Sequence, residues 1–200
     1  MTVQTLTVDI QHYWLSGTGR GGGAMLDAVA HRDAHGLPAL PGRHLKGLLR
    51  DAVENAQGLG WPGYADLAAL LFGDRTEPSA EAGFIPAPGA LRVSDARLPA
   101  DLSAWLAQPA QKSQRPRLFR VLAATRIDPD SGTADNQTLR SVEVVVPLCL
   151  QARIEPIPGA QPPADWPQRL RAVLPLITAV GGKRNRGLGR AVLSLTPAAQ

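Results

Sequence analysis

The stretch DAHGLPALPGRHLKGLLRDAVENA, residues 33–56, sets a proline–glycine turn against an amphipathic segment. Apolar residues recur there at helical spacing and predict a helix over residues 43–57, with the apolar face turned to the core. The apolar positions are Leu45, Leu48, Leu49, Ala52, Val53 and Ala56. Arg43, Lys46 and Arg50 fall on the opposite side, where the helix dipole and the free amides of the first turn favour an anion.

Gly47 lies inside this helix and costs about 1 kcal/mol relative to alanine. The glycine therefore suggests that something packs close to the backbone on the cationic side. An ordinary surface helix, with its glycine against a strand, is the alternative.

Alternating residues predict strands on both sides of this helix. Residues 5–12 alternate as a half-buried strand, with His12 on its core side, and the glycine-rich loop SGTGRGGG, residues 16–23, follows. ADLAALLFG is expected to form a second short helix closed by Gly73, and GALRVSDARL a strand. Residues 142–154 alternate as one long strand, in which Pro147 indicates an edge or a bulge.

The C-terminal part predicts a helix and a last strand. The helix follows GAQPPADWP, with Asp165 as its N-cap and a kink at Pro175, and Gly181-Gly182 ends it. GLGRAVLSLT then forms the last strand. Two strand–helix–strand halves predict a single α+β domain over residues 1–200, a ferredoxin-like (RRM-like) sandwich. Residues 99–141 are polar, basic and irregular, and we expect an inserted thumb-like hairpin there, with DPDSGTADN as its turn.

Composition narrows the class of protein. The chain has 200 residues, of which 44% are hydrophobic, and no apolar run approaches the about 18 residues that span a bilayer. The N-terminus has no basic region followed by an apolar core, so we expect a cytoplasmic protein. Cys149, the single cysteine, lies in an apolar run and is expected to be a small buried residue.

Positive charge is concentrated in two blocks although the formal net charge is only +4. Residues 102–127 and 181–190 contain no acid. In GGKRNRGLGR, residues 181–190, glycines allow tight turns that expose backbone amides, and four cations surround them. Such a nest suits a phosphodiester backbone. The GxxxxGK[ST] order of a nucleotide-binding P-loop is absent, and a plain connecting turn remains the alternative.

Together these segments resemble the RAMP superfamily, the ferredoxin-like subunits of CRISPR effector complexes. LPALPGRHLKGLLR resembles the signature (I/L)PGSSLKG(x)LR, and AVGGKRNRGLGR is similar to the C-terminal glycine-rich loop of the superfamily. FGD, LRVSDARL and TRIDPDSGTADNQTLRSVEVVVP resemble its middle segments in the same order. The two serines of the signature are here Arg43 and His44, so a guanidinium and an imidazole stand where hydroxyls contact phosphate.

The loop GGGAMLDAVAHRDAHGLPALPG resembles the backbone subunits of type III effectors, in which an aspartate cleaves target RNA with a divalent metal. The corresponding residue is Asp27, followed by Arg32. The resemblance implies metal-assisted transesterification at Asp27, with Mg²⁺ held partly by RNA phosphates and water. Asp33 is the next candidate, but it is better placed to fix the DAHG turn through an Asx bond.

The resemblance implies guide RNA, complementary target RNA, other RAMP subunits and further copies of this chain as partners. The expected RNA contacts are Arg20, Arg32, Arg43, His44, Lys46, Arg50, Arg126, Lys183, Arg184, Arg186 and Arg190. Two alternatives stay open. One is a guide-processing endoribonuclease that uses one of His12, His31, His35 and His44 as general acid or base. The other is a non-catalytic capping subunit present once per complex.

Overall fold

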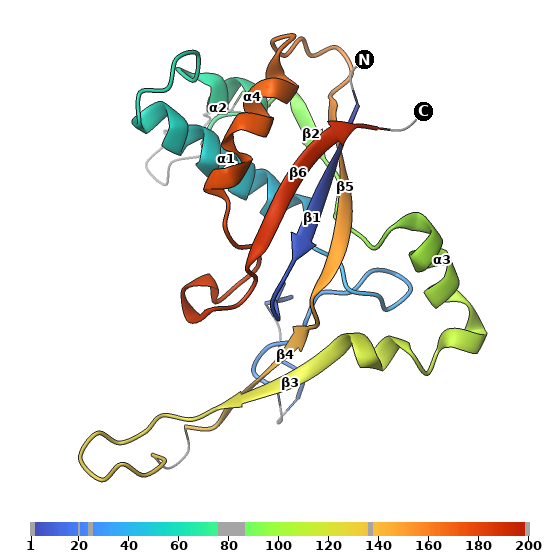
Figure 1. The fold of residues 1–200 in the computed structure, drawn as a ribbon, viewed down its shortest axis with the longest axis vertical. Helices are drawn as coiled ribbons and strands as arrows, with labels where there is room; N and C mark the ends of the chain where they lie inside the picture. The colour runs from blue at the N-terminus through green and yellow to red at the C-terminus, as the bar shows by residue number, and fades with distance from the viewer. Residues whose placement is uncertain (1–2, 20, 24–25, 76–86, 136–137, 199–200) are drawn as a thin grey trace, which may run out of the picture.

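The computed structural model describes residues 3–19, 21–23, 26–75, 87–135 and 138–198 (Figure 1). Its main sheet has four strands in the spatial order β2-β5-β1-β6, and each neighbouring pair is antiparallel. These strands are β1 (Gln4–Ile10), β2 (Leu91–Val93), β5 (Leu148–Pro156) and β6 (Ala191–Pro197). The two central strands are thus the first strands of the two strand–helix–strand halves. This order confirms the predicted ferredoxin-like sandwich.

The helices α1 (Gly42–Gly58) and α4 (Trp166–Val173) cover one face of the sheet, and the short α2 (Leu67–Phe72) lies beside α1 (Figure 1). All the predicted apolar positions of α1 are buried, as are Leu6, Val8 and Ile10 of β1. A fully buried leucine contributes about 1.5–3 kcal/mol of transfer free energy, so this interface fixes the direction in which α1 points. The first turn of α1 then lies where β1 ends and β6 begins.

A second, two-stranded sheet forms an arm that projects from the main sheet (Figure 1). Its strands are β3 (Phe119–Ala124) and β4 (Arg140–Val145). The helix α3 (Ala100–Ala107) and two 3₁₀ turns, Pro109–Gln111 and Arg115–Leu118, precede it. The prediction of an irregular segment over residues 99–141 missed α3 and β3. Neither shows a clear pattern in the sequence, because Leu102 and Trp105 of α3 and Val121 of β3 are exposed.

The predicted long strand over residues 142–154 is wrong, because it divides into β4 and β5, which belong to different sheets. Pro147 lacks an N–H and cannot continue the ladder. Val146 instead donates its N–H to the carbonyl oxygen of Leu118, at 3.0 Å. The alternation of apolar residues correctly indicated strands, but the pattern runs through the point at which the chain passes from one sheet to the other.

Two smaller predictions also fail. His12 is exposed, because β1 ends at Ile10 and the chain leaves the sheet. Asp165 occupies the N-cap position of α4 as predicted, but its side chain makes no capping hydrogen bond, and its Oδ2 accepts from Nε of Arg169 at 2.8 Å. The helix expected to kink at Pro175 and to end at Gly181-Gly182 instead ends at Val173, and a 3₁₀ turn over Leu174–Leu176 contains the proline. No helix within the described ranges is long and apolar enough to cross a membrane.

Candidate nucleic-acid interface

The first turn of α1 is fixed by a residue that the sequence reasoning did not identify. Asp95 accepts the N–H of Gly42 on its Oδ1 at 2.8 Å, 53 positions away along the chain. A Cβ at position 42 would lie 2.7 Å from the carbonyl oxygen of Ser94, so only glycine allows this approach. The predicted anion site therefore already contains one carboxylate, and its amides are not all free. No local spacing could reveal Asp95, because the tertiary fold brings it to the helix.

Residues 181–190 form a compact turn held by backbone hydrogen bonds. Gly182 donates to the carbonyl oxygen of Leu15 at 2.6 Å, and Gly189 donates to that of Tyr13 at 2.8 Å. Gly189 has a φ of +76°, and a Cβ there would overlap the carbonyl oxygen of Val180. Within the turn, Arg184–Arg186 make a 3₁₀ helix flanked by left-handed residues. The glycines thus permit the close approaches and the left-handed conformation at Gly187, whereas Lys183 is left-handed with a side chain.

The two segments singled out in the sequence meet at His44. The Nε2 of its imidazole accepts the N–H of Gly181 at 2.9 Å, across 137 positions of sequence. Burial, and secondarily the positive charge of Arg184, lower the pKa of His44 below its ordinary value. A cavity of about 260 Å³ lies at this junction, lined by Ser16, Gly17, Pro41, Arg43, His44, Gly181 and Gly182. One nitrogen of the imidazole that was expected to contact phosphate is therefore engaged inside the protein.

Cations gather around this junction without neutralising partners. None of them forms an ion pair with a described carboxylate. They are Arg43, Lys46, Lys183, Arg184, Arg186 and Arg190, and we call them the junction cations. Gly47 is exposed on the same side of α1, and an added Cβ would meet no atom within 4 Å. In the described chain nothing packs against Gly47, so the alternative that set this glycine against a strand is wrong, and the close approach of an outside partner at Gly47 stays a prediction.

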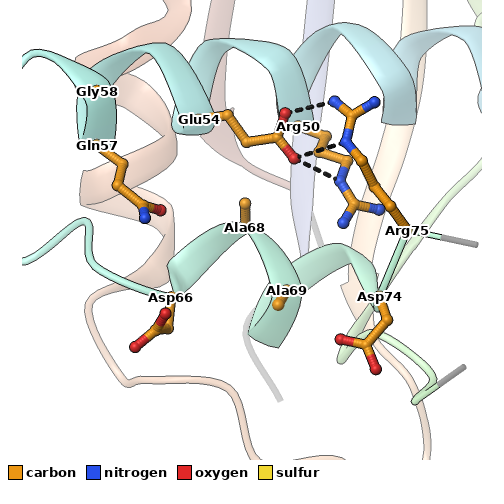
Figure 2. Close-up of a pocket in the computed structure, with 9 residues that line it drawn as sticks. All are labelled: Arg50, Glu54, Gln57, Gly58, Asp66, Ala68, Ala69, Asp74 and Arg75. Carbon is orange, nitrogen blue, oxygen red and sulfur yellow. Dashed lines mark hydrogen bonds and ion pairs between the residues drawn. The ribbon is translucent and has the colours of Figure 1, made fainter. Parts of the chain in front are cut away.

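Arg50 lies farther along the same side of α1 but differs from the junction cations. Its Nε is 2.8 Å from Oε1 of Glu54, one helical turn away. Figure 2 shows Arg75 approaching the same carboxylate, beside a cavity of about 500 Å³ between α1 and α2. The two arginines lower the pKa of Glu54. Arg50 thus belongs to a local charge network, and its predicted contact with RNA stays a prediction.

Asp27 lies on the arm, along the outer edge of β4. Its N–H donates to the carbonyl oxygen of Ser141 at 2.8 Å, and its Oδ2 accepts the N–H of Ser141 at 2.7 Å. The residue is exposed, and its Oδ1 has no hydrogen-bond partner among the described residues. The backbone therefore holds the carboxylate in one orientation with one oxygen toward solvent.

Arg32 follows Asp27 along the same edge, and its guanidinium has three partners. It forms an ion pair with Glu143 at 2.8 Å, donates to the carbonyl oxygen of Ala30 and stacks 3.9 Å from the ring centre of Phe119. These contacts tie the loop to both strands of the arm. Asp33 adopts the predicted Asx turn, with Oδ1 accepting the N–H of His35 at 2.8 Å.

One further predicted contact, Arg126, lies away from the junction. Arg126 lies on the arm beyond β3, and its Nε is 3.7 Å from Oδ2 of Asp135. Arg20 lies outside the described residues.

One extended segment joins the junction cations to the loop that carries Asp27. Leu15 accepts from Gly182 on one side, and Ser16 accepts the N–H of His31 at 2.6 Å on the other. Gly17 forms an antiparallel bridge with Ala30. The start of α1, the glycine turn and the base of the arm therefore form one continuous region at the same end of the sheet.

The described residues offer Mg²⁺ only a partial set of ligands. No group of three or more His, Cys, Asp or Glu side chains in the described ranges could hold a metal ion. The Oδ1 of Asp27, which has no partner among the described residues, fits a site to which the protein gives one carboxylate oxygen and RNA phosphates and water give the rest, an arrangement common for Mg²⁺.

The model of the RAMP superfamily matches residues 14–192 of the sequence. A comparison with curated protein sequences gives no match. A chain in a cryo-EM structure of the type III-B Cmr-beta complex bound to cognate target RNA has a TM-score of 0.70 at 12% identity, over 98% of this chain and 97% of that one. A chain from the apo state of Cmr-beta gives a TM-score of 0.65 at 12% identity, with the same coverage. Because the match spans nearly the whole sequence, the chain belongs to the RAMP superfamily.

Proposed function

We propose that this chain is an RNA-binding subunit of a type III CRISPR effector of the Cmr kind. Membership in the RAMP superfamily and the likeness to a Cmr-beta chain support this proposal. The observation that carries it is the cluster of junction cations, which have no ion pair with any described carboxylate and lie where a helix start and a glycine turn meet. Such a surface suits the phosphate backbone of a guide RNA, because cations and backbone amides bind phosphates without reading sequence. Other RAMP subunits, including copies of this chain, would continue the path of the RNA.

The binding proposal is tested by the salt dependence of RNA affinity. For single-stranded nucleic acid, the slope of log K against log salt is about −0.7 for each phosphate contacted. Arg184→Gln with Arg186→Gln should weaken binding of a single-stranded RNA and make the slope less negative by ~1.4. Lys112→Gln is the control, because Lys112 is exposed and lies outside the junction. An unchanged slope in the double variant would contradict the proposal.

We further propose that Asp27 cleaves target RNA paired with the guide. In the reaction, the 2′-oxygen of one nucleotide bonds to the adjacent phosphorus and the bond from phosphorus to the next 5′-oxygen breaks. The net proton transfer runs from the 2′-hydroxyl to the leaving 5′-oxygen. Ser141 holds the carboxylate of Asp27, and Arg32 holds the loop on the arm, so the protein supplies orientation. A divalent cation, when bound, would supply charge stabilisation at the phosphate.

The cleavage proposal is tested in the complex purified with its partner subunits and guide RNA. Asp27→Asn should abolish the cuts in complementary RNA in the presence of Mg²⁺ while guide binding is retained. The asparagine oxygen can still accept the N–H of Ser141, so the loop should keep its conformation. Asp130→Asn, at the exposed tip of the arm, is the matched control. The products should carry 2′,3′-cyclic phosphate and 5′-hydroxyl ends, and unchanged cutting by Asp27→Asn would assign the chemistry to a partner subunit.

A further inference from the structure

The contact between His44 and Gly181 defines the protonation state of the imidazole. A backbone N–H can only donate, so Nε2 of His44 must be the acceptor in this 2.9 Å hydrogen bond. An imidazolium has a proton on both ring nitrogens and cannot accept. The contact therefore exists only while His44 is neutral, with its proton on Nδ1.

The cavity beside His44 is lined by cationic and uncharged residues. Arg43 lines the same cavity from α1, and Arg184 approaches from the glycine turn. The third segment at the cavity contributes Ser16 and Gly17, which carry no charge. No described carboxylate forms an ion pair with the imidazole. Burial and Arg184 accordingly lower the pKa of His44.

The glycine turn has different attachments on its two sides. Backbone hydrogen bonds to Leu15 and Tyr13 attach it to the segment that follows β1. Toward α1, the hydrogen bond that Gly181 donates to His44 is the only one that the described residues make with the turn. Loss of this bond would remove the attachment of the turn to α1 and loosen the position of the cations at 183–186 relative to Arg43 and Lys46, while the bonds to Leu15 and Tyr13 remain.

We propose that neutral His44 is a positioning residue that holds the glycine turn against the start of α1, so that protonation of His44 weakens the binding of RNA. The inference rests on the proposed RNA binding, but the contact itself exists in the free protein. Cations held in place bind a phosphate chain more tightly than cations on a mobile turn, because binding then costs less conformational entropy.

The sign of the pH effect separates this role from direct phosphate binding. Because the folded pKa of His44 is lowered, the contact is fully present above the ordinary pKa of about 6.5. It is lost as pH falls through the lowered value. If His44 instead contacted phosphate directly, its protonation would add a positive charge and tighten binding. The positioning role therefore predicts weaker RNA binding in acid, and direct contact predicts stronger binding.

The first test measures hydrogen exchange over residues 181–190 in the RNA-free protein at pH 7.5 and pH 5, corrected for the intrinsic dependence of exchange on pH. We expect wild type to lose protection in acid. His44→Gln places an uncharged acceptor at similar reach and should keep its protection at both values, whereas His44→Ala should lack it at both. His12→Gln, which removes an exposed histidine, should behave like wild type. Protection in wild type that does not change with pH would overturn the proposal.

The second test measures the affinity for single-stranded RNA over the same pH range. Wild type should weaken by up to about tenfold for each pH unit below the lowered pKa, and His44→Gln should lose most of this dependence. Tighter binding in acid that disappears in His44→Gln would replace the positioning role with direct contact. An absence of RNA binding at every pH, together with the expected exchange result, would overturn the proposed function and leave the contact of His44 established.

Discussion

The carboxylate of Asp95 should stabilise the fold and weaken the binding of RNA at the start of α1. Substituting Asp95 should therefore change the two properties in opposite directions. Its Oδ1 accepts the N–H of Gly42, the first residue of the 17-residue helix α1. Asp95 therefore acts as a capping residue from another part of the chain. Loss of a capping side chain costs about 0.5–2 kcal/mol, typically ~1 kcal/mol. The favourable interaction of a carboxylate with the helix dipole adds ~0.3–1 kcal/mol. Since 42% of the Asp95 side chain is exposed, solvent screening places the charge contribution near the lower limit.

Asp95→Ala should therefore reduce the free energy of unfolding by ~1 kcal/mol, and Asp95→Asn, which keeps an acceptor, by ~0.3 kcal/mol. In a domain of this size, 1 kcal/mol corresponds to a shift of about 2–4 °C in Tm. Thermal unfolding by circular dichroism or calorimetry measures the difference. Asp130→Ala, which removes an exposed carboxylate from the tip of the arm, should leave Tm unchanged.

RNA binding should change in the other direction. Removing the negative charge of Asp95 from the start of α1 should strengthen the binding of single-stranded RNA by about twofold to fivefold at low salt, equivalent to ~0.3–1 kcal/mol. Fluorescence anisotropy with a labelled RNA measures this change at several salt concentrations. A Tm that does not change in Asp95→Ala would refute the capping role. Weaker RNA binding in the folded Asp95→Asn variant would refute the placement of RNA at the start of α1.

Three further outcomes follow from particular contacts. Gly189→Ala should destabilise the domain by more than about 1 kcal/mol, because the new Cβ would overlap a facing carbonyl oxygen at a φ of +76°, and a fall in Tm measures this. Arg32→Lys should lower Tm and increase proteolysis of the arm, because an ammonium cannot reproduce the ion pair with Glu143 together with ring stacking; an unchanged proteolysis pattern would contradict this. The stability that Glu54 contributes is present above the ordinary pKa of a glutamate and should be lost as pH falls through its lowered value, and Arg75→Gln should reduce this acid dependence of Tm.

The sequence by itself determined the features that repeat within a few residues. The apolar period placed α1 over Gly42–Gly58, within one residue of the predicted bounds at each end. The order of strands and helices was enough for the ferredoxin-like class, because that topology follows from two strand–helix–strand units. The Asx turn at Asp33 was also predictable, since its donors lie two and four residues away.

Only the tertiary structure decided which partners meet across long separations. The hydrogen bonds that Gly42 donates to Asp95 and that Gly181 donates to His44 join residues 53 and 137 positions apart. Their existence depends on how α1 packs on the sheet. The same packing decided that the strand pattern around Pro147 is shared between two sheets. Local periodicity reports which side of an element is buried, but the register of distant elements is set by the core as a whole, and that register determines which side chains meet.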